Sequence, residues 1–345
     1  MATHEATIPA GAGAMMRLMR TLALGLLLTA CSAPQREPAA ADPEDSDPED
    51  SGGLEDAWDP DASLKENCWP DLGNASGGFP DYEPLGITPG HHCSGTNHQD
   101  ISGVEKVVFL GDSITAGTPP TPAGEIYRAV LTESLKARFG DDLEVADCSE
   151  FGARTDDYLR DQIPRCFPGV EPKRTLVITT MGGNDTFAAA SDVLDGGGTG
   201  DALDTLNEAI GHQRDAMRWF RDNEDALFPA GVFIIAGNVY EFTDATGDMS
   251  SCPLAETFGF GGVIPELRDA YIYLNEAFVE IAVETRTDSI WMLESFCGHG
   301  FFAGDPTNEC YRGPTAEVWF DATCIHPNPA GHAAVAQMFL DVVAE

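Results

Sequence analysis

Basic residues are scarce in this 345-residue chain, because 19 lysines and arginines stand against 57 aspartates and glutamates. The formal net charge is −38. A chain this acidic repels phosphate backbones and anionic membrane surfaces instead of gathering them. The composition therefore argues against a nucleic-acid partner. Hydrophobic residues still make up 43% of the chain, which is enough for a sizeable core.

The N-terminal region lacks an apolar run long enough to span a bilayer, because its run covers only residues 21–28. A short basic region with Arg17 and Arg20 precedes this run, and the residues LTAC, ending in Cys31, close it. That order is typical of a signal peptide. The LTAC ending resembles a bacterial lipobox, whose cysteine is acylated and becomes the first mature residue.

The N-terminus therefore predicts a signal peptide with a lipobox over residues 1–31 and a lipid on Cys31. A membrane would be reached through this lipid anchor, and the chain would be exported as a lipoprotein of the bacterial cell envelope or outer membrane, or as an extracellular protein. An ordinary signal peptide, in which Cys31 is incidental, is the alternative.

Large apolar residues are nearly absent from the stretch 34–66, which is rich in aspartate and glutamate. Such a segment cannot bury enough surface to offset the entropy of ordering it, so we expect a disordered acidic tether over residues 32–66. The stretch also lacks the glycine-centred spacing and the terminal glutamate of an EF-hand calcium loop. Residues 67–345 are then expected to form a single domain, with its core from about residue 104.

A metal-ligand pattern is missing as well. The fragment His91-His92-Cys93 has no second ligand pair at a suitable spacing, so we predict no metal site and interpret Cys93 as a disulfide cysteine. Nine cysteines are present, and removing Cys31 as a lipid carrier leaves an even number. An exported chain meets an oxidising compartment, so up to four disulfides are expected, with the pairing left open. The eight cysteines are Cys68, Cys93, Cys148, Cys166, Cys252, Cys297, Cys310 and Cys324.

From about residue 104 onward, strand-like apolar runs alternate with segments of helical periodicity. This alternation predicts an α/β fold with three α/β/α layers around an open parallel sheet of about five strands. The expected strands are VEKVVFL before Gly111, LEVADC ending at Cys148, TLVITT before Met181, GVFIIAG from Gly231 and SIWMLES from Ser289. The expected helices lie near 125–138, 202–222 and 265–283, with a last one from Pro329 to the C-terminus.

Active sites of such sheets form beyond the carboxyl ends of the strands, and three strand ends carry suitable residues. Ser113 follows the first strand in FLGDSITAG, where Gly111 permits a tight bend, and a serine so placed needs a base and an oxyanion site. Gly152 could offer a backbone N–H, and Asn184, in TTMGGNDTF, a side-chain amide. The alternatives are a simple serine turn, a turn glycine, and an Asn184-Asp185 capping pair at a helix start.

The base is expected near the C-terminus, in DATCIHPNPAGHAAVAQMFL. His326 lies just before a proline-initiated helix, so its ring is held on a rigid connection. His332 falls inside that helix and is expected to cap or pack there. His299, in a glycine-rich loop, is the reserve candidate.

At this point four motifs resemble those that name the SGNH, or GDSL-type, hydrolases: GDSI with Ser113, Gly152, GGND with Asn184, and HPNPAGH with His326. All four occur in the family's order, from about residue 104 to the C-terminus. The resemblance implies a flavodoxin-like sheet, Ser113 as nucleophile, His326 as base, and Ser113, Gly152 and Asn184 as oxyanion donors. It also implies esterase or lipase chemistry without a metal or an organic cofactor.

One position departs from the family pattern, in which an acidic residue lies three residues before the histidine. Here that position is Thr323, and the nearest upstream acid is Asp321, five residues before His326. Two arrangements are open. The carboxylate of Asp321 accepts the Nδ1–H bond of His326, which we favour because a charge-assisted bond is stronger, or a backbone carbonyl such as that of Thr323 does so and leaves a Ser-His dyad.

The sequence thus predicts a carboxylic ester hydrolase that acts on a small-molecule, lipid or glycan ester through an acyl-enzyme. A carbohydrate O-deacetylase is the alternative within enzymes. A non-catalytic cell-surface protein that binds glycans or lipids is the alternative from another class, but a pure binder has no chemical need for the full set of Ser, Gly, Asn and His.

Overall fold

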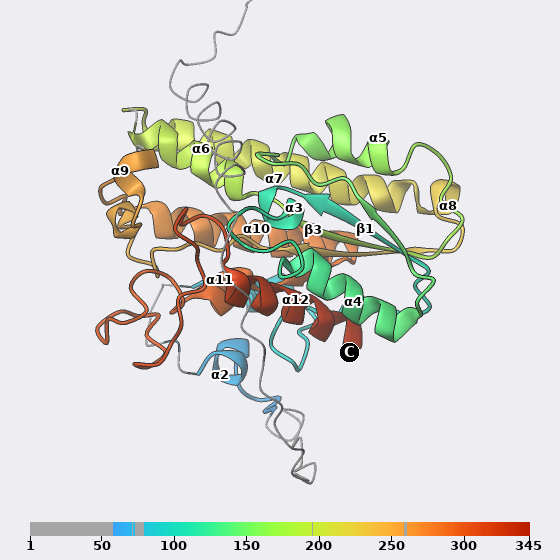
Figure 1. Cartoon of the computed structure of the whole chain (residues 1–345), viewed down its shortest axis with the longest axis horizontal. Coiled ribbons are helices and arrows are strands. Elements are labelled where there is room, and N and C mark those ends of the chain that lie inside the picture. Colours follow the sequence, from blue (N-terminus) through green and yellow to red (C-terminus); the bar gives the residue numbers. More distant parts are fainter. Residues whose placement is uncertain (1–57, 71, 73–78, 195, 259–260) are drawn as a thin grey trace, which may run out of the picture. The chain divides into compact units, whose positions relative to one another are not determined.

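The computed structural model describes residues 58–345, apart from 71, 73–78, 195, 259 and 260. The chain divides into two units, Met1–Pro60 and Asp61–Glu345. The fold described below is that of the second unit, whose helices and strands are labelled in Figure 1. The predicted signal peptide, Cys31 and most of the predicted tether lie outside the described residues. The end of the predicted tether is described, and residues 64–66 belong to helix α2 (Leu64–Cys68) instead of a disordered segment. Ser63 and Glu66 form a capping box at the N-terminus of this helix.

Five parallel strands form one sheet at the centre of this unit, in the order β2-β1-β3-β4-β5. This order and direction confirm the predicted flavodoxin-like architecture. All residues of β1 and β3 are buried, because helices cover both faces of the sheet, and this explains why neither strand alternates apolar and polar residues. The strands are β1 (Lys106–Gly111), β2 (Glu144–Asp147), β3 (Thr175–Thr180), β4 (Val232–Gly237) and β5 (Asp288–Ile290).

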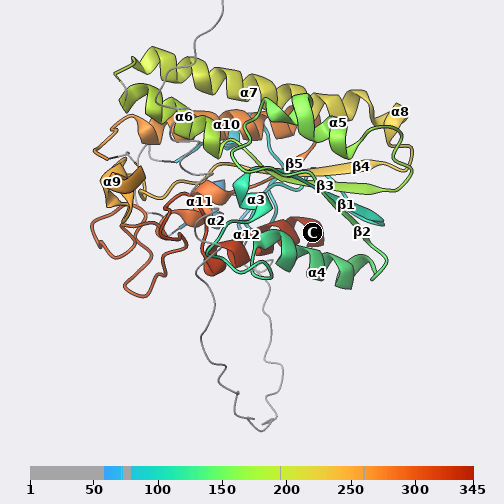
Figure 2. The same cartoon turned by 45° about the horizontal axis from the view of Figure 1, so that its top comes forward.

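Helices pack on both faces and complete the three layers (Figure 2). One face is covered by α5 (Ile163–Cys166), α6 (Gly183–Leu194), α7 (Thr199–Asp222) and α10 (Leu267–Thr285), and the other by α4 (Tyr127–Phe139) and α12 (Pro329–Ala344). On the first face, Phe167 meets Phe220 edge-on, with ring centroids 5.6 Å apart. On the second, Tyr127 of α4 stacks on Phe339 of α12. Each such buried aromatic ring contributes roughly 2–3 kcal/mol through burial.

Among the differences from the sequence-based expectation, two concern the elements that follow β5 and β3. The run 289–295 is not one strand, because β5 ends at Ile290 and helix α11 (Met292–Phe296) follows. Most residues on both sides of this junction are buried, so a short apolar run carries no period that separates strand from helix. The helix α6 was not predicted as an element, although its first turn holds the Asn184-Asp185 pair.

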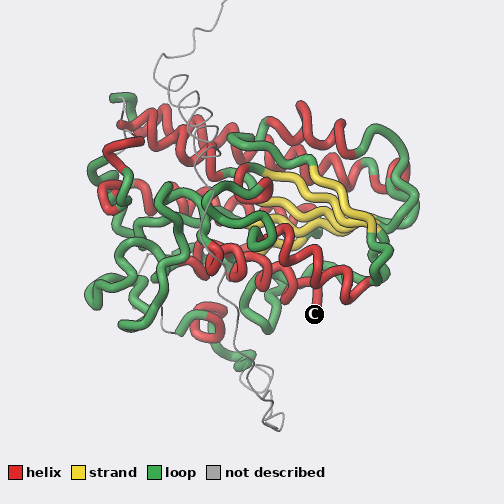
Figure 3. The backbone as a smooth tube through the Cα atoms, viewed as in Figure 1, coloured by secondary structure: helices red, strands yellow, loops and turns green. Residues whose placement is uncertain are grey.

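The long connections of the chain gather at the end of the sheet where the strands terminate (Figure 3). All eight predicted disulfide cysteines are paired, which confirms the expected set of four bridges, and Cys93 is one of them. The pairs are Cys68–Cys93, Cys148–Cys166, Cys252–Cys324 and Cys297–Cys310. Among the described helices, none has the length and apolar character needed to cross a membrane.

Candidate active site

Ser113 lies just beyond the carboxyl end of strand β1, which pairs with β2 and β3, and it is the first residue of the short helix α3 (Ser113–Ala116). The chain turns sharply at Gly111, whose φ is +133° and where an added Cβ would come within 2.5 Å of the carbonyl oxygen of Thr180. The side-chain amide of the buried Gln162 pairs with both the N–H and the C=O of Gly111, each at 2.8 Å. The turn that presents Ser113 is therefore fixed from two sides.

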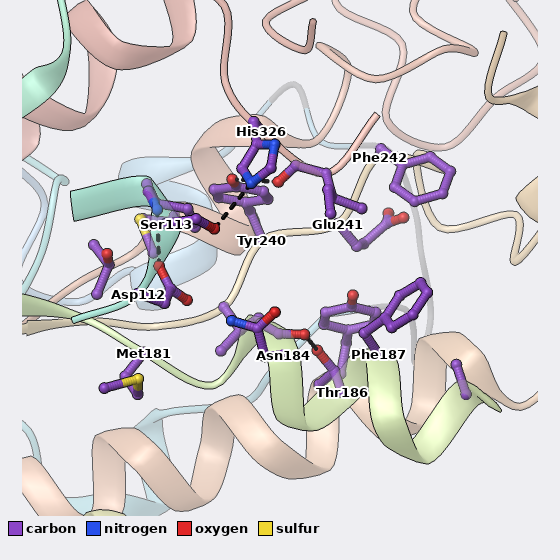
Figure 4. Close-up of a pocket in the computed structure, with 18 of the residues that line it drawn as sticks. Asp112, Ser113, Met181, Asn184, Thr186, Phe187, Tyr240, Glu241, Phe242 and His326 are labelled. Atoms are coloured by element: carbon purple, nitrogen blue, oxygen red, sulfur yellow. Dashed lines mark hydrogen bonds between the residues drawn. The ribbon is translucent and has the colours of Figure 1, made fainter. Parts of the chain in front are cut away.

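His326 lies opposite Ser113, with its Nε2 2.9 Å from Ser113 Oγ (Figure 4). The loop that carries His326 closes on itself through a bridge between Phe320 and Pro327. Helix α12 begins two residues later, where the Asn328 side chain accepts a hydrogen bond from the N–H of Gly331. Ser113 and His326 are 213 positions apart in sequence, and the fold brings them into hydrogen-bonding contact.

The other ring nitrogen of His326, Nδ1, has neither of its two expected partners, the carboxylate of Asp321 and the backbone carbonyl of Thr323, as its hydrogen-bond partner. Nδ1 lies 2.9 Å from the hydroxyl oxygen of Thr323. That hydroxyl in turn donates to Oδ1 of Asp321 at 2.5 Å, and the backbone N–H of Thr323 donates to the same oxygen at 2.8 Å. Asp321 thus reaches His326 through Thr323, because its carboxylate folds back onto the backbone of its own turn.

Three groups were predicted to stabilise an oxyanion. The N–H groups of Ser113 and Gly152 have no hydrogen-bond partner among the described residues. Asn184 lines the same pocket as Ser113 and His326, and its Nδ2 donates to the carbonyl oxygen of Ala153 at 2.9 Å. Gly152, with φ +75°, does not line the described pocket, but this bond joins the loop that carries it to Asn184.

Asp185 also joins helix α6 to the loop after β2. The sequence indicated this residue only as part of a helix cap. It is 2% exposed and accepts hydrogen bonds from the N–H and the hydroxyl of Thr155 and from the guanidinium of Arg154. Both side chains of the Asn184-Asp185 pair therefore reach across to the loop after β2.

A pocket extends from Ser113 and His326 between α6 and the segment after β4 (Figure 4). Most of its lining is apolar, and Phe187 and Phe242 lie at the end away from Ser113. Further apolar lining comes from Met181, Ala190, Val239, Met249, Leu267 and Met292. Glu241 also lines the pocket, but its carboxylate is occupied by the backbone N–H groups of Thr243 and Ala245.

Burial dominates the electrostatics of the site. It lowers the pKa of His326 to about 4, with a further contribution from the neighbouring His332. Burial also raises the pKa of Asp112, the residue before Ser113, to about 7, against the hydrogen bond that Asp112 accepts from the N–H of Ile114. The pKa of Asp321 is raised by burial and lowered in part by its bonds from Thr323. His326 is therefore neutral at pH 7, as a general base must be.

The remaining candidate histidines lie elsewhere. His332 is fully buried in α12, where it stacks on Tyr127 and its Nδ1 accepts the N–H of that residue, so the expected packing role is confirmed. His299 stacks on Trp319 and contacts the carbonyl oxygen of Glu317, not Ser113. In the part of the chain that the structure describes, no group of His, Cys, Asp and Glu side chains could hold a metal ion.

The model of the GDSL-like lipase/acylhydrolase family matches residues 109–334, and the chain belongs to this family. The resemblance seen in the four motifs is thus confirmed. No curated protein matches the chain by sequence.

Solved structures with a similar fold include an extracellular lipase from Streptomyces rimosus, which is 19% identical and covers 69% of this chain and 99% of its own, with a TM-score of 0.46. A phospholipase A1 from Streptomyces albidoflavus NA297 is 18% identical and covers 69% and 98%, with a TM-score of 0.44. A G-D-S-L family protein from Veillonella parvula DSM 2008 is 17% identical and covers 70% and 98%, with a TM-score of 0.42.

Proposed function

We propose that this family member hydrolyses carboxylic esters at Ser113, with His326 as the general base. The observation that carries the proposal is the 2.9 Å contact between Ser113 Oγ and His326 Nε2 at one end of an apolar pocket. A serine hydroxyl is a weak nucleophile at its own pKa, and a neutral imidazole in hydrogen-bonding contact removes its proton as attack proceeds.

In the proposed reaction, Ser113 Oγ attacks the ester carbonyl while Nε2 of His326 takes the hydroxyl proton. The negative charge that develops on the carbonyl oxygen is stabilised by the N–H groups of Ser113 and Gly152 and by the second amide hydrogen of Asn184. The imidazolium of His326 then protonates the leaving alcohol. Water, activated by the same imidazole, releases the acid from Ser113.

The lining of the pocket supports an ester with an apolar group of several carbons. An apolar acyl group that packs against Phe187, Phe242 and Met249 binds favourably because apolar surface is removed from water. The same side chains offer few hydrogen bonds to sugar hydroxyls. The preferred substrates in this proposal are esters of medium or longer acyl chains, and the O-deacetylase alternative becomes an outcome of the test.

The proposal is tested with p-nitrophenyl acetate, butyrate and long-chain esters, together with an acetylated xylan, on the wild type and on Ser113→Ala. We expect hydrolysis that increases with acyl length up to the capacity of the pocket, and none by a folded Ser113→Ala protein. Activity that survives in the variant excludes Ser113 as the nucleophile. Faster turnover of acetylated xylan than of any longer ester instead favours the deacetylase.

We further propose that the chain is exported and anchored by a lipid on Cys31. The four disulfides are typical of proteins that leave the reducing cytosol, and the odd ninth cysteine closes an LTAC sequence. In fractionated cells the wild type is expected with the membranes and Cys31→Ser in the soluble fraction. A Cys31→Ser protein that stays with the membranes contradicts the anchor.

A further inference from the structure

The loop that carries His326 contains a chain of hydrogen bonds with a hydroxyl in the middle. Thr323 Oγ1 lies 2.9 Å from His326 Nδ1 and 2.5 Å from Asp321 Oδ1. Thr323 occupies the position three residues before His326, and its side chain makes the contact with the ring. We propose that Thr323 is a positioning residue for the general base, acting as a hydroxyl relay between Asp321 and His326. This inference rests on the proposed function of Ser113 and His326.

The direction of each bond follows from counting protons. An ionised carboxylate only accepts hydrogen bonds, so the single proton of the Thr323 hydroxyl points to Asp321. The lone pairs of Thr323 Oγ1 are then left for His326, whose Nδ1 must carry the proton. Nε2 is consequently unprotonated and faces the hydroxyl of Ser113. The relay therefore selects the one neutral tautomer of His326 that can accept the serine proton.

The backbone holds the relay in place. The N–H of Thr323 donates to the same Asp321 oxygen as its hydroxyl, and the N–H of Cys324 donates to the carbonyl oxygen of Asp321. The N–H of Asp321 donates to the carbonyl oxygen of His326, which closes the loop. Asp321 is 7% exposed, so solvent offers its carboxylate little competition for the hydroxyl proton.

The relay also differs from a direct carboxylate in its electrostatics. The charge of Asp321 lies one hydroxyl farther from the ring than in a triad, so it stabilises the imidazolium less. This agrees with the low pKa of His326, which is set by burial. The relay thus fixes the tautomer strongly and raises the basicity of the ring weakly.

The first test compares Thr323→Val with Thr323→Ser. Valine keeps the shape of the side chain and removes the hydroxyl, which leaves Nδ1–H buried without an acceptor. We expect Thr323→Val to lose on the order of a hundredfold in kcat with KM nearly unchanged, and Thr323→Ser to stay within about threefold of the wild type. Circular dichroism and thermal unfolding confirm that both variants fold. The proposal is overturned if the serine variant exceeds the valine variant by less than about tenfold.

A second test asks whether the two side chains act as one unit. Asp321→Asn is expected to reduce kcat, but adding it to Thr323→Val should cause little further loss, because the chain is already broken. Full additivity of the two losses would overturn the relay.

A third test moves the carboxylate next to the ring. In the double variant Asp321→Asn/Thr323→Asp, a carboxylate at position 323 would contact Nδ1 directly and no second charge would oppose it. A negative charge beside the imidazolium raises the pKa of His326, so the acid limb of kcat/KM should move to higher pH than in the wild type. An acid limb that stays in place shows that side chain 323 does not contact the ring, which overturns the proposal.

These outcomes are separable from a failure of the proposed function. If folded Ser113→Ala retains hydrolysis, the proposed nucleophile is wrong whatever the Thr323 variants do. If Ser113→Ala is inactive while Thr323→Val matches Thr323→Ser, only the relay is wrong.

Discussion

The carboxylate of Asp185 accepts two hydrogen bonds from Thr155, one from its backbone N–H and one from its hydroxyl, each at 3.1 Å. The two residues belong to different strand ends, since Thr155 follows β2 and Asp185 lies in the first turn of α6 after β3. This pair fixes the loop of Gly152 against the helix of Asn184, and with it the spacing of two proposed oxyanion donors.

The first prediction concerns this pair. Asp185→Ala should lower kcat by about ten- to a hundredfold and destabilise the fold by about 1–3 kcal/mol, because it leaves buried donors of Thr155 unsatisfied. The matched control is Thr155→Val, which removes one of the bonds and keeps the backbone contact, so its losses should be smaller. Steady-state kinetics and urea unfolding check both values. An Asp185→Ala protein that loses stability but keeps its kcat would assign Asp185 to the fold alone.

Asn184 is expected to act on the transition state and not on the fold. Asn184→Ala should lose on the order of a hundred- to a thousandfold in kcat with little change in KM, as for other single oxyanion donors. Asn207→Ala is the control, because Asn207 accepts an exposed hydrogen bond from Tyr273 and lies outside the pocket. An Asn184→Ala variant with the kcat of the control leaves Asn184 as a link to Ala153 only.

Much of this site could be predicted from the sequence because its pieces follow apolar strands directly. Ser113 and Asn184 come after strands whose buried runs are visible as continuous hydrophobic stretches, and parallel strands end at a common edge. His326 could be placed by the proline-initiated helix that follows it. These strand and helix positions were enough to place Ser113, Asn184 and His326 at the same edge of the sheet.

The side-chain contacts between loops could not be predicted in the same way. The sequence predicts a role for Thr323 only through its backbone carbonyl, because nothing in the sequence shows that its hydroxyl turns towards His326. Nor does the sequence show that the carboxylate of Asp321 turns back onto its own turn. Asp185 follows Asn184 like an ordinary helix-capping residue, and only packing shows that it binds Thr155 thirty residues away. Disulfide pairing and the short helix α11 depend on tertiary contacts for the same reason.

The activity should persist well into the acidic range. A general base must be neutral, and burial holds the pKa of His326 at about 4, below its ordinary value. The acid limb of kcat/KM is therefore expected near pH 4, with activity lost as the pH falls through it. The measurement is kcat/KM between about pH 3 and about pH 8, a window that extends below the expected limb and above the ordinary imidazole pKa of about 6.5.

Two controls accompany the pH profile. His326 and His332 both have a pKa lowered to about 4, so the unfolded chain binds more protons than the native one as the pH falls below about 6.5. The stability of the fold should therefore decrease as the pH falls from about 6.5 to about 4. Thermal unfolding at each pH separates this loss of stability from the loss of catalysis. Asp112→Asn removes the carboxyl whose pKa is raised to about 7. A limb near pH 6.5 that persists in Asp112→Asn would contradict the low pKa of His326.

The last prediction concerns the Cys252–Cys324 disulfide, which ties the proposed base to the wall of the pocket. Cys324 lies two residues before His326 and has a φ of +70°, a conformation that needs support from its surroundings. Its partner Cys252 follows Met249, which lines the pocket. Replacing both cysteines by serine should therefore affect the position of His326 as well as the stability of the fold.

The control is the Cys68–Cys93 pair, whose cysteines lie outside the pocket. By loop length alone, removing the Cys252–Cys324 bridge, with a separation of 72 residues, should cost about 4 kcal/mol of stability. Removing the Cys68–Cys93 bridge, with a separation of 25 residues, should cost about 3.5 kcal/mol. The two double variants should thus unfold at similarly reduced temperatures. We expect Cys252→Ser/Cys324→Ser to lose about tenfold or more in kcat below its unfolding temperature, because a small displacement of the base is costly, and Cys68→Ser/Cys93→Ser to keep the wild-type kcat. Equal kcat in both folded variants would show that the Phe320–Pro327 bridge and helix α12 hold His326 without the disulfide.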